Sequence, residues 1–250
     1  MSQGAKVEGA LRLRREGDVA WVELLRPTIN MRVVRALSEA LDALEDDEAV
    51  RFVVLSGQPG CFCAGIDFAD FRPDAPMDIH GFHKWEQLCV RLERLSKATV
   101  AAIDGVCTGG GAQLALVCDV RVATRRSALQ FDEIHKGFLP GMATFRLAKY
   151  VGLGRAKRLL LQGAPAGAEA ALAMGLIDAI AEDDALDVGV SEQLRAFGPA
   201  HPVATELGKR LLLESYAEPF EQAIGGFLAA QHRAISQSAF LETLAAARQK

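Results

Sequence analysis

The stretch Thr108–Leu116, with the sequence TGGGAQLAL, decides how this chain is interpreted. An apolar run at residues 99–103 precedes it, so the pattern predicts a strand, a glycine turn and the start of a short apolar helix. Adjacent glycines let a ligand approach the main chain closely, because no Cβ stands in the way. The first turn of a helix also presents unpaired N–H groups at the positive end of its dipole. The stretch is therefore a candidate binding site for negative charge.

Three interpretations of these glycines stay open from the residues alone. The first is an ordinary tight turn between a strand and a helix. The second is a dinucleotide-binding fingerprint, which is disfavoured because Leu114 occupies the place of a required glycine. The third is an oxyanion hole, which needs a second N–H donor from elsewhere in the chain.

Composition excludes several classes of protein. The chain has 250 residues, of which 50% are hydrophobic, and this is enough for a substantial core. The net charge is −4 without an evident basic face, so we expect no nucleic-acid partner. Residues 1–7 lack the apolar core of a secretory signal, and no apolar run is long enough to span a bilayer. We therefore expect a soluble, cytoplasmic protein without a membrane partner.

The cysteines predict neither a disulfide framework nor a metal site. They are an odd number, Cys61, Cys63, Cys89, Cys107 and Cys118, and most lie in apolar contexts. No C-x-x-C pair occurs, and no histidine lies at zinc-ligand spacing from the first two cysteines. Reduced, structural thiols are expected.

Hydrophobic patterning predicts an α/β core followed by a helical C-terminal part. Strands are expected at residues 11–13, 19–24, 52–55, 99–103, 120–123, 128–131 and 176–180, and helices at 33–44, 82–95, 145–151, 155–161 and 168–174. A polar, proline-bearing loop is expected at 72–78. From residue 184 onward only helices are expected, with breaks near 198–199 and 218–219. The predicted division is a core domain at 1–183 and a helical region at 184–250.

A set of short motifs, in a fixed order, resembles the crotonase (enoyl-CoA hydratase/isomerase) superfamily over nearly the whole chain. The motifs are residues 62–68 (FCAGIDF), 103–105 (IDG), 109–111 (GGG), 131–133 (FDE), 140–141 (PG), 175–178 (GLID) and 238–240 (SAF). The resemblance implies an α/β spiral of ββα repeats, with C-terminal helices that support homotrimers or dimers of trimers (hexamers). It also implies an acyl thioester substrate carried on coenzyme A or on an acyl carrier protein, with no other cofactor and no metal.

The resemblance also implies a site. The backbone N–H groups of Ile66 and Gly110 are expected to form the oxyanion hole, and Glu133 is expected to act as general acid and base. Two preorganised amides suit an enolate beside a thioester, whose charge concentrates on one oxygen. The residues expected to line the substrate are Ala64, Gly65, Asp67, Gly109, Gly111, Gln113, His135, Pro140 and Gly141.

One departure from the family pattern bears on the chemistry. Fatty-acid hydratases of this superfamily carry two catalytic glutamates, and here the first position is Gln113 while Glu133 is retained. A glutamine can hydrogen-bond water or substrate but cannot exchange a proton near neutral pH. Ordinary hydration of crotonyl-CoA is therefore expected to be weak. A single glutamate suits dehydration, isomerisation, or protonation of an enolate after decarboxylation.

The subfamily stays open. Residues 28–30, 53–55 and 62–68 resemble the crotonase-like dehydratases of polyketide β-branching, which also retain only the later glutamate. Residues 137–145 look more like the decarboxylases paired with them, although those lack an acid at the position of Glu133. Enzymes similar to carboxymethylproline synthase also combine a glutamine with the later glutamate. We favour dehydration of a 3-hydroxyacyl thioester in secondary metabolism; isomerisation, decarboxylation and a non-catalytic subunit that assists a partner synthase are the alternatives.

Several other residues have two interpretations each. His135 could orient Glu133 or act as a second acid, but a lone histidine near a site is more often structural. Asp67 is expected to hold the oxyanion loop rather than to react. Phe240 and Lys250 could contact the adenine of coenzyme A. The alternatives are that Phe240 packs in the core and that Lys250 belongs to a frayed terminus. Lid residues His80, His83 and Trp85 are expected to pack in the core or lie on the surface, or else to shape the acyl pocket.

Overall fold

The structure, a computed structural model, describes residues 5–7, 9–70 and 79–247. The loop expected at 72–78 and the candidate Lys250 lie outside this part of the chain.

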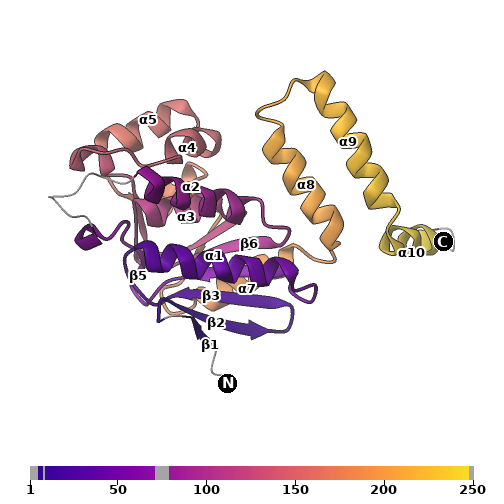
Figure 1. The fold of residues 1–250 in the computed structure, drawn as a ribbon, viewed down its shortest axis with the longest axis horizontal. Coiled ribbons are helices and arrows are strands. Elements are labelled where there is room, and N and C mark those ends of the chain that lie inside the picture. Colours follow the sequence, from indigo (N-terminus) through magenta and orange to yellow (C-terminus); the bar gives the residue numbers. More distant parts are fainter. Residues whose placement is uncertain (1–4, 8, 71–78, 248–250) are drawn as a thin grey trace.

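A seven-stranded sheet forms the centre of the molecule (Figure 1). Its strands, in order across the sheet, are β1 (Ala5–Val7), β2 (Leu11–Glu16), β3 (Val19–Leu24), β4 (Phe52–Ser56), β6 (Ala98–Ile103), β8 (Val120–Thr124) and β11 (Ala179–Ala181). The first three strands pair antiparallel, which confirms the hairpin expected at residues 11–24, and the remaining neighbours pair parallel.

A second, four-stranded sheet explains the spiral. Its strands, in order, are β10 (Ala166–Gly167), β9 (Ala128–Gln130), β7 (Val106–Thr108) and β5 (Cys61–Cys63). Along the chain β4 is followed by β5, β6 by β7 and β8 by β9, so each turn of the chain adds one strand to each sheet. The helices α2 (Ile79–Glu93) and α3 (Gly110–Val117) close two of these turns. The expected α/β spiral of ββα repeats is confirmed.

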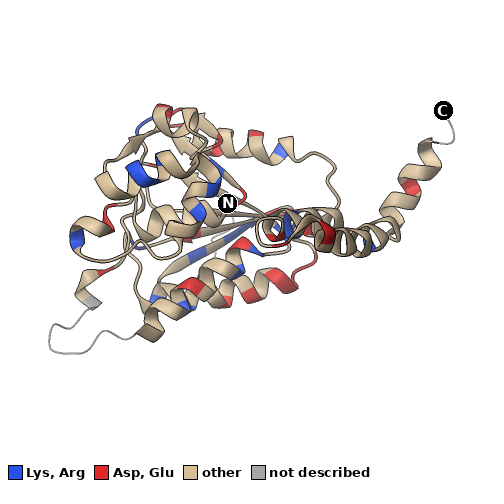
Figure 2. Cartoon of the chain, turned by 90° about the horizontal axis from the view of Figure 1, so that it is seen from above, with Lys and Arg blue, Asp and Glu red and all other residues tan. Residues whose placement is uncertain are grey.

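Further helices surround the sheets and extend from them (Figure 1). They are α1 (Met31–Asp46), α4 (Ala143–Val151), α5 (Leu153–Gln162), α6 (Ala168–Ala173), α7 (Leu186–Ala196), α8 (Pro202–Glu214), α9 (Phe220–Ile235) and α10 (Ser238–Ala247). The last three reach away from the sheets, and α10 ends far from the core. Acidic and basic residues are interspersed on the same helices (Figure 2).

Alternation along the central strands supplies both faces of the core. In β4, Val53 and Leu55 join the larger apolar cluster under α1, α2 and α3, whereas Val54 joins a smaller cluster that includes Val190 of α7. Successive side chains of a strand point to opposite faces, so a fully apolar strand fits a sheet that is covered on both sides. The helix α7 therefore packs on the sheet, while the division of the chain at residues 183 and 184 stays a prediction.

One expected element differs from the structure. The apolar run at 176–180 predicted a strand, but β11 begins only at Ala179. Leu176 and Ile177 instead lie buried in the turn that ends α6, where Leu176 N donates to Ala171 O at 2.8 Å. Gly175, with φ of +78°, makes that turn possible. The two side chains are apolar because they cover a helix end, not because they extend a strand.

Close packing at the start of α3 yields a first prediction. A Cβ on Gly111 would lie 2.4 Å from Cys63 O, so we expect Gly111→Ala to lower the free energy of unfolding by about 3 kcal/mol. Gly208→Ala is the matched control, because Gly208 lies within α8 with open space around it and alanine favours helix by about 1 kcal/mol. Urea denaturation of both variants checks this, and equal effects would contradict it.

Candidate active site

The glycine turn joins β7 to α3 as expected. Gly109 has φ of +57°, a conformation that favours glycine, and its N–H donates to Gln130 O at 2.9 Å. The helix begins at Gly110, and all of its residues are buried. The turn is thus fixed to β9 at its start and enclosed by the core along its length.

The segment that contains Ile66 lies directly against this turn. It is held by main-chain bonds to the segment before α1: Ile29 N donates to Gly65 O at 2.8 Å and Asp67 N donates to Ile29 O at 2.8 Å. A Cβ on Gly65 would lie 3.6 Å from Gly110 N, so the two segments approach at main-chain distance. Within the described parts of the chain, no acceptor pairs with the N–H of Ile66 or of Gly110. Two unpaired amide donors therefore come from adjacent segments.

Glu133 places a carboxylate beside the turn. It opens a single 3₁₀ turn, Glu133–Lys136, and its side chain is buried, with the residue only 5% exposed. A Cβ on Gly109 would lie 2.9 Å from Glu133 Oε1, while Glu133 Oε2 is buried without a hydrogen-bond partner among the described residues. Burial raises the pKa of this carboxyl above its usual value, against the opposing effect of its own backbone N–H. A buried carboxylate oxygen without a hydrogen-bond partner is costly to a fold and is typical of a functional group.

Apolar side chains form the wall above Gly110. A Cβ on Gly110 would lie 3.1 Å from Ile29 Cδ1 and 3.5 Å from Trp85 Cζ2, so Trp85, expected to belong to a lid, is buried over the turn. Phe68 and Phe138 meet edge to face, 5.9 Å between ring centroids. This pair bridges the segment after Ile66 and the segment after Glu133.

Gln113 belongs to a polar network that the sequence did not indicate. It is 2% exposed, and its Nε2 donates to Glu86 Oε1 at 2.8 Å and contacts Cys89 Sγ at 3.5 Å. The same Glu86 oxygen accepts from Met142 N at 2.9 Å, and Glu86 Oε2 lies 3.3 Å from Arg146 Nη1. Gln113 is therefore bound to a carboxylate of α2.

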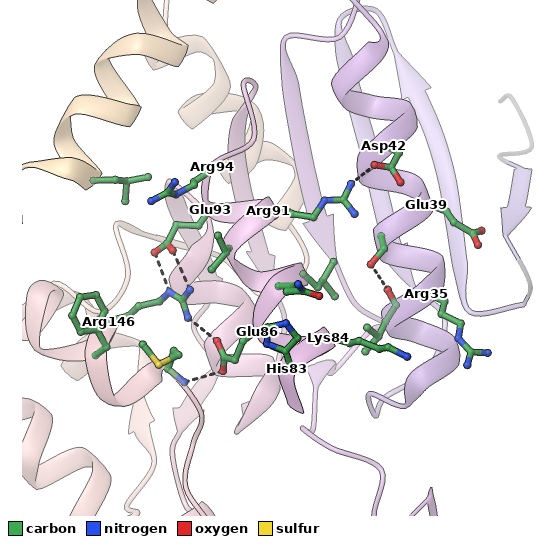
Figure 3. A pocket seen from close by; sticks show the side chains of 18 of the residues that line it. Arg35, Glu39, Asp42, His83, Lys84, Glu86, Arg91, Glu93, Arg94 and Arg146 are labelled. Carbon is green, nitrogen blue, oxygen red and sulfur yellow. Dashed lines mark hydrogen bonds and ion pairs between the residues drawn. The ribbon is translucent and has the colours of Figure 1, made fainter. Parts of the chain in front are cut away.

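Arg146 completes this network from α4. It is only 4% exposed, and its guanidinium binds both oxygens of Glu93 at 3.0 Å (Figure 3). Glu86 and Arg146 also line a cavity of about 860 Å³ between α1, α2, α4 and α8. Figure 3 shows Arg146 placed between the two carboxylates. Glu86 thus belongs both to the network around Gln113 and to the lining of this cavity.

The other candidate residues lie at different distances from the turn. Gly141 is close, because its Cβ would lie 2.8 Å from Gln113 Oε1, and Pro140 precedes it. Asp67 accepts from Thr28 Oγ1 at 3.2 Å and from Ala69 N at 3.1 Å, so it braces its own segment. Ala64 is exposed beside that segment.

His135 is exposed and turned toward the end of α5, with its Nε2 3.4 Å from Leu161 O. The substrate roles expected for these residues remain predictions.

The cysteines are free in the structure, as expected. Burial raises the pKa of Cys63 to about 12 and that of Cys107 well above its usual value. Deep burial and a raised pKa make a thiol inert. These side chains pack the core beside the glycine turn.

The sequence analysis missed Glu86 and Arg146. Both are charged residues on helices whose neighbouring positions are buried, and this is a weak signal of a buried ion pair. Gln113 is 27 positions from Glu86, and Glu93 is 53 positions from Arg146, so no local spacing in the sequence reveals these contacts.

Taken together, two unpaired main-chain donors and a buried carboxylate form a site that can hold negative charge and transfer a proton next to it.

No helix of the described residues is long and apolar enough to cross a membrane.

Known proteins with this fold and these motifs define the family. A family profile described as enoyl-CoA hydratase/isomerase matches residues 14–240. The chain belongs to the enoyl-CoA hydratase/isomerase family.

Individual relatives agree with that assignment. A probable enoyl-CoA hydratase of Bacillus subtilis (strain 168) is 33% identical over 67% of this chain and 66% of its own length. An enoyl-CoA hydratase of Amycolatopsis orientalis is 30% identical over 82% of this chain and 90% of its own length. The solved structure of a Geobacillus kaustophilus HTA426 protein described as enoyl-CoA hydrates subunit I matches with a TM-score of 0.89 at 26% identity, covering 99% of this chain and 96% of that one. The chain thus spans just under two thirds of the first relative and most of the others.

Burial of Glu133 gives a prediction for stability. Because the folded state binds the Glu133 proton more tightly than the unfolded state does, stability falls as the pH rises from 4.5 through the raised pKa. We expect Glu133→Gln to unfold at a higher temperature than the native chain at about pH 8, with the difference shrinking toward about pH 4. Thermal unfolding across this range, followed by circular dichroism, measures it. A difference that is constant with pH would show that the carboxyl is not perturbed.

Proposed function

We propose that this protein is a lyase that dehydrates a 3-hydroxyacyl thioester through an enolate. The observation that carries the proposal is the buried carboxylate of Glu133, whose Oε2 has no hydrogen-bond partner among the described residues, beside the glycine turn. In the same part of the chain no acceptor pairs with the N–H of Ile66 or of Gly110. A thioester oxygen held by those two amides would gain charge as the α-proton leaves. Loss of one such donor typically costs about 3–4 kcal/mol of barrier.

The proposed reaction uses one carboxylate twice. Glu133 removes the α-proton, and the resulting negative charge passes to the thioester oxygen, where the two amides stabilise it. The enolate then expels the 3-hydroxyl group, which takes the same proton from Glu133 and leaves as water. The product is the enoyl thioester, and Glu133 returns to its ionised form. A pKa raised by burial suits a group that both takes and returns a proton.

The described activities of the relatives support the same reaction, the loss or addition of water. Two of them are described as enoyl-CoA hydratases, and hydration is the reverse of dehydration. Gln113 supports a single acid–base group, because its amide does not exchange protons near neutral pH. Residues 28–30 and 62–68 resemble the dehydratases of polyketide β-branching. A polyketide-type acyl group, carried on coenzyme A or on a carrier protein, therefore stays part of the proposal.

We also propose self-association through the C-terminal helices as a homotrimer or a dimer of trimers. Large apolar side chains are exposed there, among them Phe220, Leu228 and Leu241. Exposed apolar patches of this kind mark interaction surfaces. Light scattering of the purified protein is expected to give the mass of three or six chains, and a monomer would contradict it.

A substrate panel tests the proposed function. The protein is incubated with 3-hydroxyacyl, enoyl and malonyl-type thioesters on both carriers, and the products are read by mass spectrometry. Loss of water from the 3-hydroxyacyl thioester is expected. Double-bond migration or loss of carbon dioxide would indicate isomerisation or decarboxylation instead. Inactivity combined with stimulation of a partner synthase would indicate a non-catalytic subunit.

The role of Glu133 is tested on the substrate that the panel identifies. Glu133→Gln is expected to lower kcat by about 10²-fold or more, because the variant has no group that moves the proton. Glu169→Gln, the same change on an exposed glutamate of α6, is expected to leave turnover unchanged. Activity of Glu133→Gln within a few-fold of the native protein would refute the assignment.

A pair of glycine variants tests whether turnover depends on the position of the Glu133 carboxylate as well as on its presence. Gly109→Ala places a Cβ 2.9 Å from Glu133 Oε1 and is expected to lower kcat. Gly137→Ala is the matched control, because Gly137 also has a positive φ but has open space around it. Equal loss of turnover in both variants would attribute the effect to backbone strain.

A further inference from the structure

The hydrogen bond between Gln113 and Glu86 has a consequence for the substrate. We propose that Glu86 is a positioning residue, which fixes the side-chain amide of Gln113 with its carbonyl oxygen toward the substrate side, so that the site selects a thioester carrying a hydroxyl group. The proposal rests on the proposed function and names the feature of the substrate that this site recognises.

The orientation of the Gln113 amide follows from the chemistry of its partner. An ionised carboxylate only accepts hydrogen bonds, so the Gln113 nitrogen must face Glu86 Oε1, 2.8 Å away. A rotated amide would place two acceptor oxygens at that distance, and Cys89 Sγ lies beside the same nitrogen. The Gln113 oxygen is therefore the amide atom that is not bonded to Glu86.

Glu86 is held firmly enough to impose this orientation. Met142 N donates to the same Glu86 oxygen at 2.9 Å, and Arg146 lies against the other oxygen. Arg146 is itself fixed by two hydrogen bonds to Glu93. A network in which each member has partners confines its side chains to one arrangement. Gln113 thus has a defined donor side and a defined acceptor side.

Gln113 lies one helical turn after the glycine turn, and the position found beside its oxygen is that of a Cβ on Gly141, 2.8 Å away. Gln113 follows Gly109 by one helical turn, and Gln113 N donates to Gly109 O at 2.9 Å. Long side chains of a helix lean toward the preceding turn, which for Gln113 contains Gly109 and Gly110. Among the described residues no donor pairs with Gln113 Oε1, and this atom is not one of the buried polar atoms closed off from solvent.

Gly141 keeps that oxygen uncovered. A Cβ there would lie 2.8 Å from Gln113 Oε1 and 2.4 Å from Glu86 Oε1. An open acceptor in a buried site is satisfied by a ligand that brings a donor, and it disfavours an analogue that lacks one. The 3-hydroxyl of the proposed substrate is such a donor, whereas the alkyl chain of a saturated thioester is not.

Binding without turnover tests the proposal. In a Glu133→Gln background, isothermal titration compares 3-hydroxybutyryl with butyryl thioesters of coenzyme A and of phosphopantetheine. The hydroxylated thioester is expected to bind about tenfold more tightly. Adding Glu86→Gln lets the Gln113 amide adopt either orientation, so this preference is expected to fall close to onefold.

Two further variants guard against general damage to the fold. Glu169→Gln changes an exposed glutamate of α6 that pairs with Arg125 and lies outside this network, and it is expected to keep the preference. The exchange variant, Glu86→Gln with Gln113→Glu, returns a fixed acceptor to position 113, because the new amide at position 86 donates to it. Its preference for the hydroxylated thioester is expected to recover.

The outcomes distinguish this proposal from the proposed function. An unchanged preference in Glu86→Gln, no recovery in the exchange variant, or no binding of either thioester would overturn the role of Glu86. Dehydration by the native protein and its loss in Glu133→Gln are measured separately with the substrate panel. The proposed function can therefore stand when the role of Glu86 fails, and a preference without dehydration would reject the proposed function alone.

Discussion

The site depends on the approach of two main-chain segments at a distance that only glycine permits. Gly65 and Gly109 both have positive φ, and a Cβ on either would meet atoms of the opposite segment or of Glu133. Main-chain bonds to Ile29 hold one segment, and a main-chain bond to Gln130 holds the other. Because each segment is fixed from behind by a strand or a bridge, the unpaired amides need no rearrangement to face a ligand.

The same arrangement concentrates unfavourable contributions to the free energy of folding at the site. Within the described residues, a buried carboxylate oxygen without a hydrogen-bond partner and two amide donors without acceptors each oppose folding. The continuous apolar clusters on the two faces of the sheet offset these terms, since strands such as β4 contribute to both. The residues that stabilise the fold and those of the candidate site are thus different residues of the same repeats.

Local patterns predicted much of the fold and only part of the site. The glycine turn, α1 and the hairpin at residues 11–24 follow from neighbouring residues, and the structure contains them. The strand expected at Leu176 and Ile177 was wrong, because burial at a helix end and burial in a strand give the same apolar pattern. Glu86 was not foreseeable, since its contact with Gln113 depends on how α2 packs on α3.

The contact between Gln113 and Glu86 also constrains the order in which this lineage can change. A glutamate at position 113 would face a second carboxylate where an amide nitrogen now stands, 2.8 Å away. Like charges at that separation repel strongly inside a protein. A glutamate at position 113 therefore becomes compatible with the fold only after the carboxylate at position 86 has been replaced.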